Sequence, residues 1–158
     1  MAEHRPEFLQ LDVDEGLARE VLALQRDAYA VEAALIGSDG IPALTETLDQ
    51  LRDAGETWLG CFDGAGLTGA VAWQLLDDGT VDICRLVVAP RAFRAGVATA
   101  LLDELDHRYP ANPMIVSTGS ANGPALSLYE RRGFRPVRQR EVAPGLMVTE
   151  LARPAKGG

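Results

Sequence analysis

A short segment rich in arginine and small residues, residues 91–99, lies between two apolar stretches. The run Val81–Val88 is apolar and β-branched, and apolar residues recur every four positions over residues 97–105, a spacing typical of a helix. A strand therefore leads into a helix through a turn with little side-chain bulk. Free N–H groups at such a helix start attract a phosphate or pyrophosphate, and Arg94 would add a charged contact. An ordinary turn, with Gly96 there for close packing, explains the segment equally well.

Composition and charge narrow the classes of function. The chain has 158 residues, which is enough for one domain with a sizeable core. Hydrophobic residues make up 47% and charged residues 24%, the usage of a globular protein. The net charge of −8 argues against nonspecific nucleic-acid binding, which needs a basic face. The same charge would steer a cationic acceptor such as an amine, although it is also an ordinary source of solubility.

Targeting and metal-binding signals are absent from the sequence. No apolar run reaches the length of a membrane span, and the first residues lack a secretory signal pattern. Cys61 and Cys84 have no partner spacing and are expected to be buried, reduced thiols. His4 and His107 are isolated, which argues against a metal site. We therefore expect a cytoplasmic protein without a membrane or nucleic-acid partner.

Hydrophobic periodicity predicts elements in the order β-α-α-β-β-β-α-β-α-β-β. The predicted strands are Glu7–Val13, Thr57–Asp63, Leu67–Leu76, Thr80–Val88, Met114–Thr118 and two within Phe134–Leu151. The predicted helices have the inner face Leu17, Val21, Leu24 and Ala28, then Leu44, Leu48 and Leu51 after Pro42, and then span Ala95–Tyr109 and Gly123–Arg132. Ala34–Pro42 should break the first helix, and Ala152–Gly158 should be a frayed tail. The unit from Thr80 to Thr118 should pair in parallel within a mixed α+β sheet.

One glycine motif is a decoy. Gly64–Gly69 matches the pattern GxGxxG and follows a predicted strand. A dinucleotide-binding fingerprint needs a helix next, whereas the following residues, AVAWQLL, alternate as in a strand. We interpret this segment as a hairpin and do not expect a nicotinamide-dependent oxidoreductase.

Three segments together resemble the GNAT superfamily of acyl-CoA-dependent N-acetyltransferases. They are the strand–turn–helix at Val87–Leu102, the strand IVSTGSAN that runs into a helix at Asn122, and ALSLYERRGF at Ala125–Phe134. The resemblance extends from Glu7 to Leu151. It implies one domain over residues 1–158 with an ordered core at 7–151.

The chain is also similar to a bacterial subgroup of this superfamily. That subgroup shares the pattern YxxExxLIG…IP, here Tyr29 to Pro42, and a DICRL-type strand, here Asp82–Leu86. The resemblance implies a mainly antiparallel mixed sheet of about seven strands flanked by helices. Similar proteins often form homodimers through their C-terminal strands, so a homodimer is possible.

The family's cofactor loop, [QR]-x-x-G-x-[GA], has its small positions at Gly96 and Ala98, and its Gln/Arg position holds Phe93. The resemblance implies acetyl-CoA as the cofactor. Its diphosphate would be held by the backbone N–H groups of Arg94, Ala95, Gly96, Val97, Ala98 and Thr99. Because Phe93 replaces the family's Gln or Arg, Arg94 would be the one side chain of this loop to contact the diphosphate. Its pantetheine would pair as an added strand with Leu86, Val87 and Val88.

Two residues near the last predicted helix are candidates for contact with the reacting end of the cofactor. Tyr129 lies in the pattern L-Y-E-x-x-G-F, and in similar proteins this hydroxyl reaches the CoA sulfur and acts as general acid. The alternative is core packing with the hydroxyl satisfied nearby. Asn122 either caps the helix or contacts pantetheine.

Two carboxylates compete for the role of general base. Asp82 lies fourteen residues before Gly96, and histone-acetylating relatives have a glutamate at this separation. Asp82 could instead be solvated or paired with an arginine. Glu32 is the competitor, one helical turn after Tyr29 and next to the loop that borders the acceptor cleft in similar proteins.

Three residues are candidates for acceptor binding. Tyr29 and Glu32 would bind a cationic acceptor or act through water, or they form a solvated helix face. Strict alternation along the strand places Arg85 on the face of Ile83, opposite Asp82. Arg85 would bind an acceptor carboxylate, or pair with Asp82 or Glu32.

The resemblance therefore implies direct acetyl transfer from acetyl-CoA to a primary amine of a small molecule or peptide. A thioester is already activated, so no enzyme nucleophile is required. The alternative is a non-catalytic module on the same fold that senses acyl-CoA or binds a partner protein. Phe93, at the family's Gln/Arg position, is the residue that favours this alternative.

Overall fold

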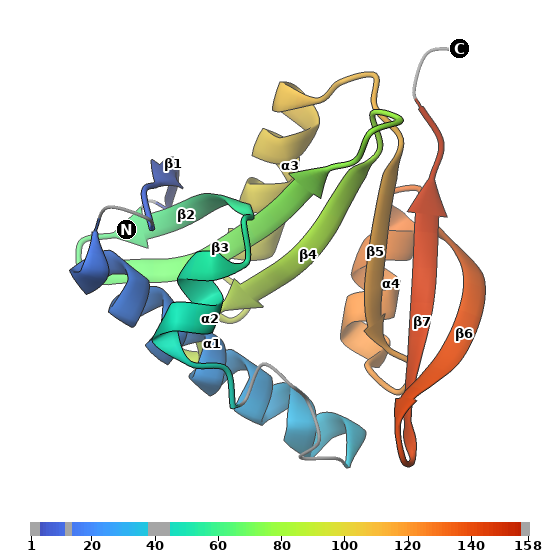
Figure 1. Ribbon diagram of the computed structural model, residues 1–158, viewed down its shortest axis with the longest axis horizontal. Coiled ribbons are helices and arrows are strands. Elements are labelled where there is room, and N and C mark those ends of the chain that lie inside the picture. The colour runs from blue at the N-terminus through green and yellow to red at the C-terminus, as the bar shows by residue number, and fades with distance from the viewer. Residues whose placement is uncertain (1–3, 12–13, 38–44, 156–158) are drawn as a thin grey trace.

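A mixed sheet of seven strands forms the centre of the fold (Figure 1). The structure is a computed structural model that describes residues 4–11, 14–37 and 45–155. Its strands are β1 Arg5–Leu9, β2 Thr57–Asp63, β3 Gly66–Leu75, β4 Val81–Val88, β5 Met114–Gly119, β6 Arg135–Ala143 and β7 Leu146–Arg153. Its helices are α1 Glu15–Ile36, α2 Leu48–Asp53, α3 Val97–Arg108 and α4 Gly123–Arg131, with a 3-10 turn, η2, at Pro90–Ala92. The strands lie side by side in the order β1-β2-β3-β4-β5-β7-β6.

Neighbouring strands are antiparallel except for β4 and β5, which are parallel and connected through α3. The predicted order of elements, the mainly antiparallel mixed sheet and the parallel pairing are thereby confirmed. Because consecutive strands β2, β3 and β4 are joined by short turns, they form a meander that contributes a large part of the core.

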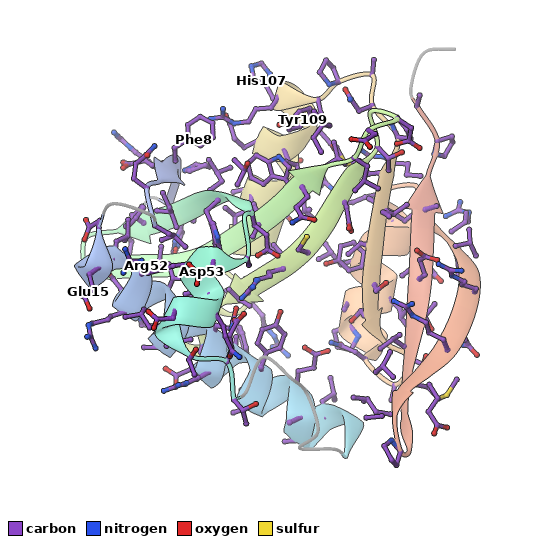
Figure 2. The ribbon with its side chains drawn as sticks, in the orientation of Figure 1. Phe8, Glu15, Arg52, Asp53, His107 and Tyr109 are labelled. Carbon is purple, nitrogen blue, oxygen red and sulfur yellow. The ribbon has the colours of Figure 1, made fainter. Side chains whose placement is uncertain are left out.

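Helices cover both faces of this sheet, with α1 and α2 on one face and α3 and α4 on the other (Figure 1). In Figure 2, Arg52 marks α2 and Tyr109 marks the end of α3. The approach of α3 depends on Gly69 of β3, where a Cβ would lie 2.6 Å from Val97 Cγ1. The missing side chain at Gly69 lets the start of α3 lie against the sheet, which sets the position of the loop before it.

The strands β4 and β5 pair only near their beginnings, over residues 81–83 and 114–116. Beyond these residues the two strands diverge, as Figure 1 shows. From Arg85 to Val88, β4 continues to pair with β3 on one side and has no strand partner from β5 on the other. This leaves an open strand edge directly before the loop that leads into α3.

A β-bulge at Cys84 changes which side chains share a face of β4. On β3, Ala72 lies opposite Arg85 and Trp73 lies opposite Ile83, so Cys84 is an extra residue between them. Since Ala72 and Trp73 are adjacent, they point to opposite faces, and so do their partners Arg85 and Ile83. The prediction that Arg85 shares a face with Ile83 is therefore wrong, because strict alternation does not allow for a bulge.

The first helix is longer than its sequence pattern predicted. α1 continues through Ile36, beyond the expected break at Ala34, and ends at Gly37, whose φ of 71° forms a left-handed cap. This extension amounts to less than one helical turn. Among the described residues, no helix combines the length and apolar character needed to cross a membrane.

The chain ends of the sheet also differ from prediction. β1 begins at Arg5, two residues before the expected start, and β7 continues through Arg153, into the expected frayed tail. Arg153 is buried, with its guanidinium 4.9 Å from the centre of the Phe134 ring. This contact and the pairing of Arg153 with Met114 extend the last strand. Pro42 and Leu44, placed in the second predicted helix, lie outside the described residues.

The GxGxxG segment forms the turn and first residues of a hairpin. β2 ends at Asp63, β3 begins at Gly66, and the two strands pair in antiparallel fashion. A strand and not a helix follows the glycines, which confirms the interpretation of this segment as a hairpin.

Candidate functional site

A cavity of about 630 Å³ lies where β4 and β5 diverge, a size suited to a small-molecule ligand. Side chains and backbone from α1, β4, the loop before α3, and α4 meet in it. The site residues expected from sequence that line it are Tyr29, Glu32, Arg85, Leu86, Val87, Val88, Arg94, Gly96, Val97, Ala98, Thr99, Asn122 and Tyr129. Asp82 and Ala95 are not among the lining residues. The tertiary structure thus brings together four segments that are far apart in the sequence.

The loop at one end of the cavity presents unpaired backbone N–H groups. The hydrogen bonds of α3 begin with the N–H of Ala100, which donates to the Gly96 carbonyl oxygen at 2.9 Å. The N–H groups of Val97, Ala98 and Thr99 therefore have no acceptor within the helix. The N–H of Ala95 is turned elsewhere, since it donates to the Ala92 carbonyl oxygen at 3.2 Å. The loop can accordingly hold an anion through its backbone, without Ala95.

Two residues of this loop have left-handed backbone conformations. Gly96 has a φ of 78°, and Arg94, with a φ of 67°, is the one non-glycine residue with positive φ in the described part of the chain. That conformation costs a non-glycine residue about 1–2 kcal/mol, so the fold holds Arg94 in place against strain. Its side chain is exposed and lines the cavity, where it adds positive charge beside the free N–H groups.

Tyr129 lies at the inner wall of the cavity on α4. Its ring is buried and packs edge to face against Phe134, with ring centres 5.6 Å apart. Burial, followed by the nearby Tyr29 and Glu32, raises the pKa of the Tyr129 hydroxyl above its usual value. The phenol is therefore protonated at neutral pH and can donate a hydrogen bond or proton into the cavity.

Glu32 reaches across the opening from α1 to the other side of the cavity. The Asn122 side chain and the Gly119 backbone lie near its carboxylate and act to lower its pKa. Asn122 caps α4 as predicted, because its Oδ1 accepts from the Ala125 N–H at 3.2 Å. Burial nevertheless dominates and raises the pKa of Glu32. A carboxylate with a raised pKa is a stronger base than a solvated one, which suits proton removal.

Tyr29 stands one helical turn before Glu32 and lines the same wall of the cavity. Burial, and then the charge of Glu32, raise the pKa of its hydroxyl. The positive charge of Arg85, from β4, acts to lower the pKa of the Tyr29 hydroxyl. Tyr29 therefore offers a neutral hydroxyl between the carboxylate of α1 and the guanidinium of β4.

Arg85 is bound by two carboxylates that the sequence analysis did not single out. Its Nε donates to Glu56 at 2.7 Å, its Nη2 donates to Glu46 at 2.9 Å, and its Nη1 donates to Gln25 at 2.9 Å and also to Glu46. The guanidinium also lies 5.4 Å from the centre of the Trp58 ring. The expected partners, Asp82 and Glu32, do not pair with Arg85.

Glu46 and Glu56 flank the short helix α2, and no periodic pattern marks them. The available signal was Arg85 itself, because a cation in an apolar strand requires carboxylate partners. The partners lie 39 and 29 residues away in the chain, so only the packing of α2 on the sheet identifies them.

Asp82 and Cys84 differ in their relation to the cavity. Asp82 lies outside it, opposite Gln74 on β3, and burial and then the charge of Glu150 raise its pKa. Cys84 lines the cavity and is half-buried, whereas Cys61 is fully buried. Burial, together with the nearby Glu56, raises the pKa of the Cys84 thiol to about 12. Cys84 therefore has the chemistry of a neutral thiol and not of a thiolate nucleophile.

Comparison with known proteins identifies relatives of this chain. The model of a family described as "Acetyltransferase (GNAT) family" matches residues 19–134. The UPF0157 protein YqkA of Bacillus subtilis (strain 168) is 38% identical over 144 residues, which are 90% of this chain and 41% of that protein. The chain therefore spans less than half the length of this relative.

Two solved structures show the same fold at low sequence identity. The ribosomal-protein-S18-alanine N-acetyltransferase of Escherichia coli superposes with a TM-score of 0.74 at 16% identity, covering 99% of this chain and 96% of that one. The PaiA N-acetyltransferase of Thermoplasma acidophilum, solved in complex with coenzyme A, has a TM-score of 0.73 at 13% identity and covers 94% and 98%.

Proposed function

Since this chain belongs to the GNAT family of acetyltransferases, we propose that it transfers an acetyl group from acetyl-CoA to a primary amine of a small molecule or a peptide. The observation that carries the proposal is one cavity that joins an anion-binding loop to a carboxylate and a neutral phenol. These groups match the needs of the reaction, which are a site for a diphosphate, a base for the amine, and a proton donor for the leaving sulfur.

The residues present fit acetyl-CoA as the donor. The backbone N–H groups of Gly96, Val97, Ala98 and Thr99 and the side chain of Arg94 would hold its diphosphate. The open edge of β4 at Leu86–Val88, which has no partner from β5, would pair with the pantetheine amides. Bound acetyl-CoA supplies an activated thioester, so the protein needs no nucleophile of its own.

Glu32 is the proposed general base. It lines the cavity, whereas Asp82 lies outside it, and its raised pKa makes it a better proton acceptor than a solvated carboxylate. Glu32 takes a proton from the acceptor ammonium at a carboxylate oxygen, either directly or through water. The Asn122 side chain lies near that carboxylate and is proposed to orient it, as a positioning residue.

Tyr129 is the proposed proton donor to the leaving sulfur. Its buried hydroxyl carries its proton at neutral pH, as an ordinary phenol does, and burial raises its pKa further. Its ring is held by Phe134. Tyr29 is proposed to orient the acceptor through its hydroxyl, next to Glu32.

A binding measurement followed by an activity measurement tests the proposal. Acetyl-CoA and CoA should raise the melting temperature of the purified protein by mass action, and NAD should not. A panel of amines and peptides is then assayed for release of free thiol from acetyl-CoA. Glu32→Gln should lower the rate of thiol release by about 10²-fold or more. Asp82→Asn is the comparison variant and should have a much smaller effect on that rate.

The outcomes separate the alternatives. No melting shift with acetyl-CoA would contradict the proposal at the binding step. A shift without thiol release on any acceptor would support the non-catalytic module. A large loss in Asp82→Asn and none in Glu32→Gln would assign the base to Asp82.

A further inference from the structure

Resting on the acetyl transfer proposed above, we propose that the acceptor is an amine that carries no carboxylate, and that the site discriminates against amino acids. The observation is the pairing of Arg85 with both Glu46 and Glu56, which occupies the cation that could otherwise hold an acceptor carboxylate on this side of the cavity.

Four of the five N–H groups of Arg85 donate to protein oxygens. Each of its three guanidinium nitrogens donates to a protein oxygen, and Glu46 takes bonds from two of them. Its side chain is 11% exposed, and those of Glu46 and Glu56 are 16% and 9% exposed. Freeing Arg85 for an acceptor carboxylate would leave two buried carboxylates without their cation, which is costly.

The positive charge of Arg85 is neutralised by its partners. Glu46 and Glu56 pair with its guanidinium from outside the cavity lining, with Arg26 beside Glu46. Deprotonated Glu32 places a negative charge on the cavity wall itself. Among the described residues that line the cavity, the other cation is Arg94, which stands in the anion-binding loop at the opposite end. An acceptor carboxylate placed near Glu32 would meet repulsion in a site of low solvent access, whereas an ammonium group would be attracted.

The charge of the bound acceptor also acts on the pKa of Glu32, the proposed base. A second carboxylate near Glu32 would raise its pKa further and keep it protonated, because like charges oppose ionisation. A cationic acceptor would lower that pKa and favour the form that takes a proton. An amine without a carboxylate therefore binds better and is deprotonated more readily.

Matched pairs of acceptors test the inference directly. Cadaverine and lysine, agmatine and arginine, and tyramine and tyrosine differ only by the α-carboxylate. The value of kcat/KM is measured by thiol release, and the acetylated product is identified by mass spectrometry. Within each pair that the enzyme uses, we expect kcat/KM to be at least tenfold higher for the amine without the carboxylate. Lysine amide, which keeps the lysine skeleton but lacks the negative charge of the carboxylate, should behave like cadaverine.

A variant links the discrimination to the charges around Arg85. Glu56→Gln removes one negative charge, and its amide oxygen can still accept from Arg85 Nε. We expect this variant to reduce the ratio of the two kcat/KM values within each pair by several-fold, mainly by raising kcat/KM for the amino acid. Glu141→Gln, at an exposed position of β6, removes the same charge from the protein and should leave the ratio unchanged.

The outcomes distinguish this inference from the proposed function. Equal or better use of the amino acids would overturn the inference and leave acetyl transfer intact. Binding of acetyl-CoA without thiol release on any acceptor, amides and peptides included, would overturn both. If Glu56→Gln does not fold, the ratios measured on the wild-type protein decide the question alone.

Discussion

Glu32 and Asn122 come from opposite sides of the opening between β4 and β5, and the Asn122 side chain lies close enough to the Glu32 carboxylate to act on its pKa. The Oδ1 of Asn122 accepts from the N–H of Ala125, so its amide nitrogen is the group turned toward Glu32. One side chain therefore begins α4 and lies beside the candidate base on α1. This relationship connects the two helices across the cavity and allows the role of Glu32 to be tested without changing Glu32.

Asn122→Asp should move the acid limb of the rate profile to higher pH. Aspartate keeps the cap on α4 but puts a second carboxylate against Glu32, and two adjacent carboxylates cannot both ionise easily. We expect the apparent pKa in the profile of kcat/KM against pH to rise by about one unit or more. Asn122→Ser, which keeps a cap without adding charge, is the control. An unchanged profile in Asn122→Asp would mean that Glu32 is not the titrating base.

Glu32→Gln should stabilise the protein more at pH 8 than at pH 4. Burial raises the pKa of Glu32 in the folded chain above its unfolded value, so the folded state holds the proton more tightly. The stability that this contributes is complete below the unfolded pKa, near 4.3, and is lost as the pH rises through the folded pKa. Glutamine does not titrate and escapes this loss. The measurement is the difference in melting temperature between the variant and the wild type at each pH. An equal difference at pH 4 and pH 8 would contradict the prediction.

Tyr129→Phe should lower kcat by about 10²-fold, the usual scale for loss of a general acid, with little change in CoA affinity. The substitution removes the hydroxyl and keeps the ring that packs against Phe134. A melting temperature close to that of the wild type would show that packing is preserved. Full activity in this variant would assign Tyr129 to core packing alone.

Arg94→Gly should separate backbone strain from ligand binding. Glycine adopts the φ of 67° at this position without penalty, so the ligand-free protein should gain up to about 1 kcal/mol of stability. Loss of the guanidinium should weaken CoA binding about tenfold, the value of a charge-assisted hydrogen bond. Arg94→Ala loses the same charge and keeps the strain, so it should weaken binding without the gain in stability. Undiminished CoA affinity in both variants would exclude Arg94 from the diphosphate site.

Local patterns determined the order of elements and the position of the cofactor loop. The alternation from Thr57 to Val88 and the spacing of Val97, Leu101 and Leu105 predicted strands and a helix that the structure contains. These predictions succeeded because side chains in strands and helices repeat with fixed periods. The glycine at position 96 was placed in the turn for the same reason, since it stands between two regular segments.

Only the tertiary structure decided the roles of the charged residues. The bulge at Cys84 turns Arg85 toward α2, where Glu46 and Glu56 bind it, and the packing of α1 on the sheet brings Glu32 near Asn122. A bulge leaves no mark on hydrophobic periodicity, and the approach of side chains 90 residues apart depends on how the helices pack on the sheet. The sequence alone therefore determined which elements form and where the loop before α3 lies. Packing of those elements decided which carboxylate enters the cavity and what charge surrounds it, because burial and ion pairing are properties of neighbours in space.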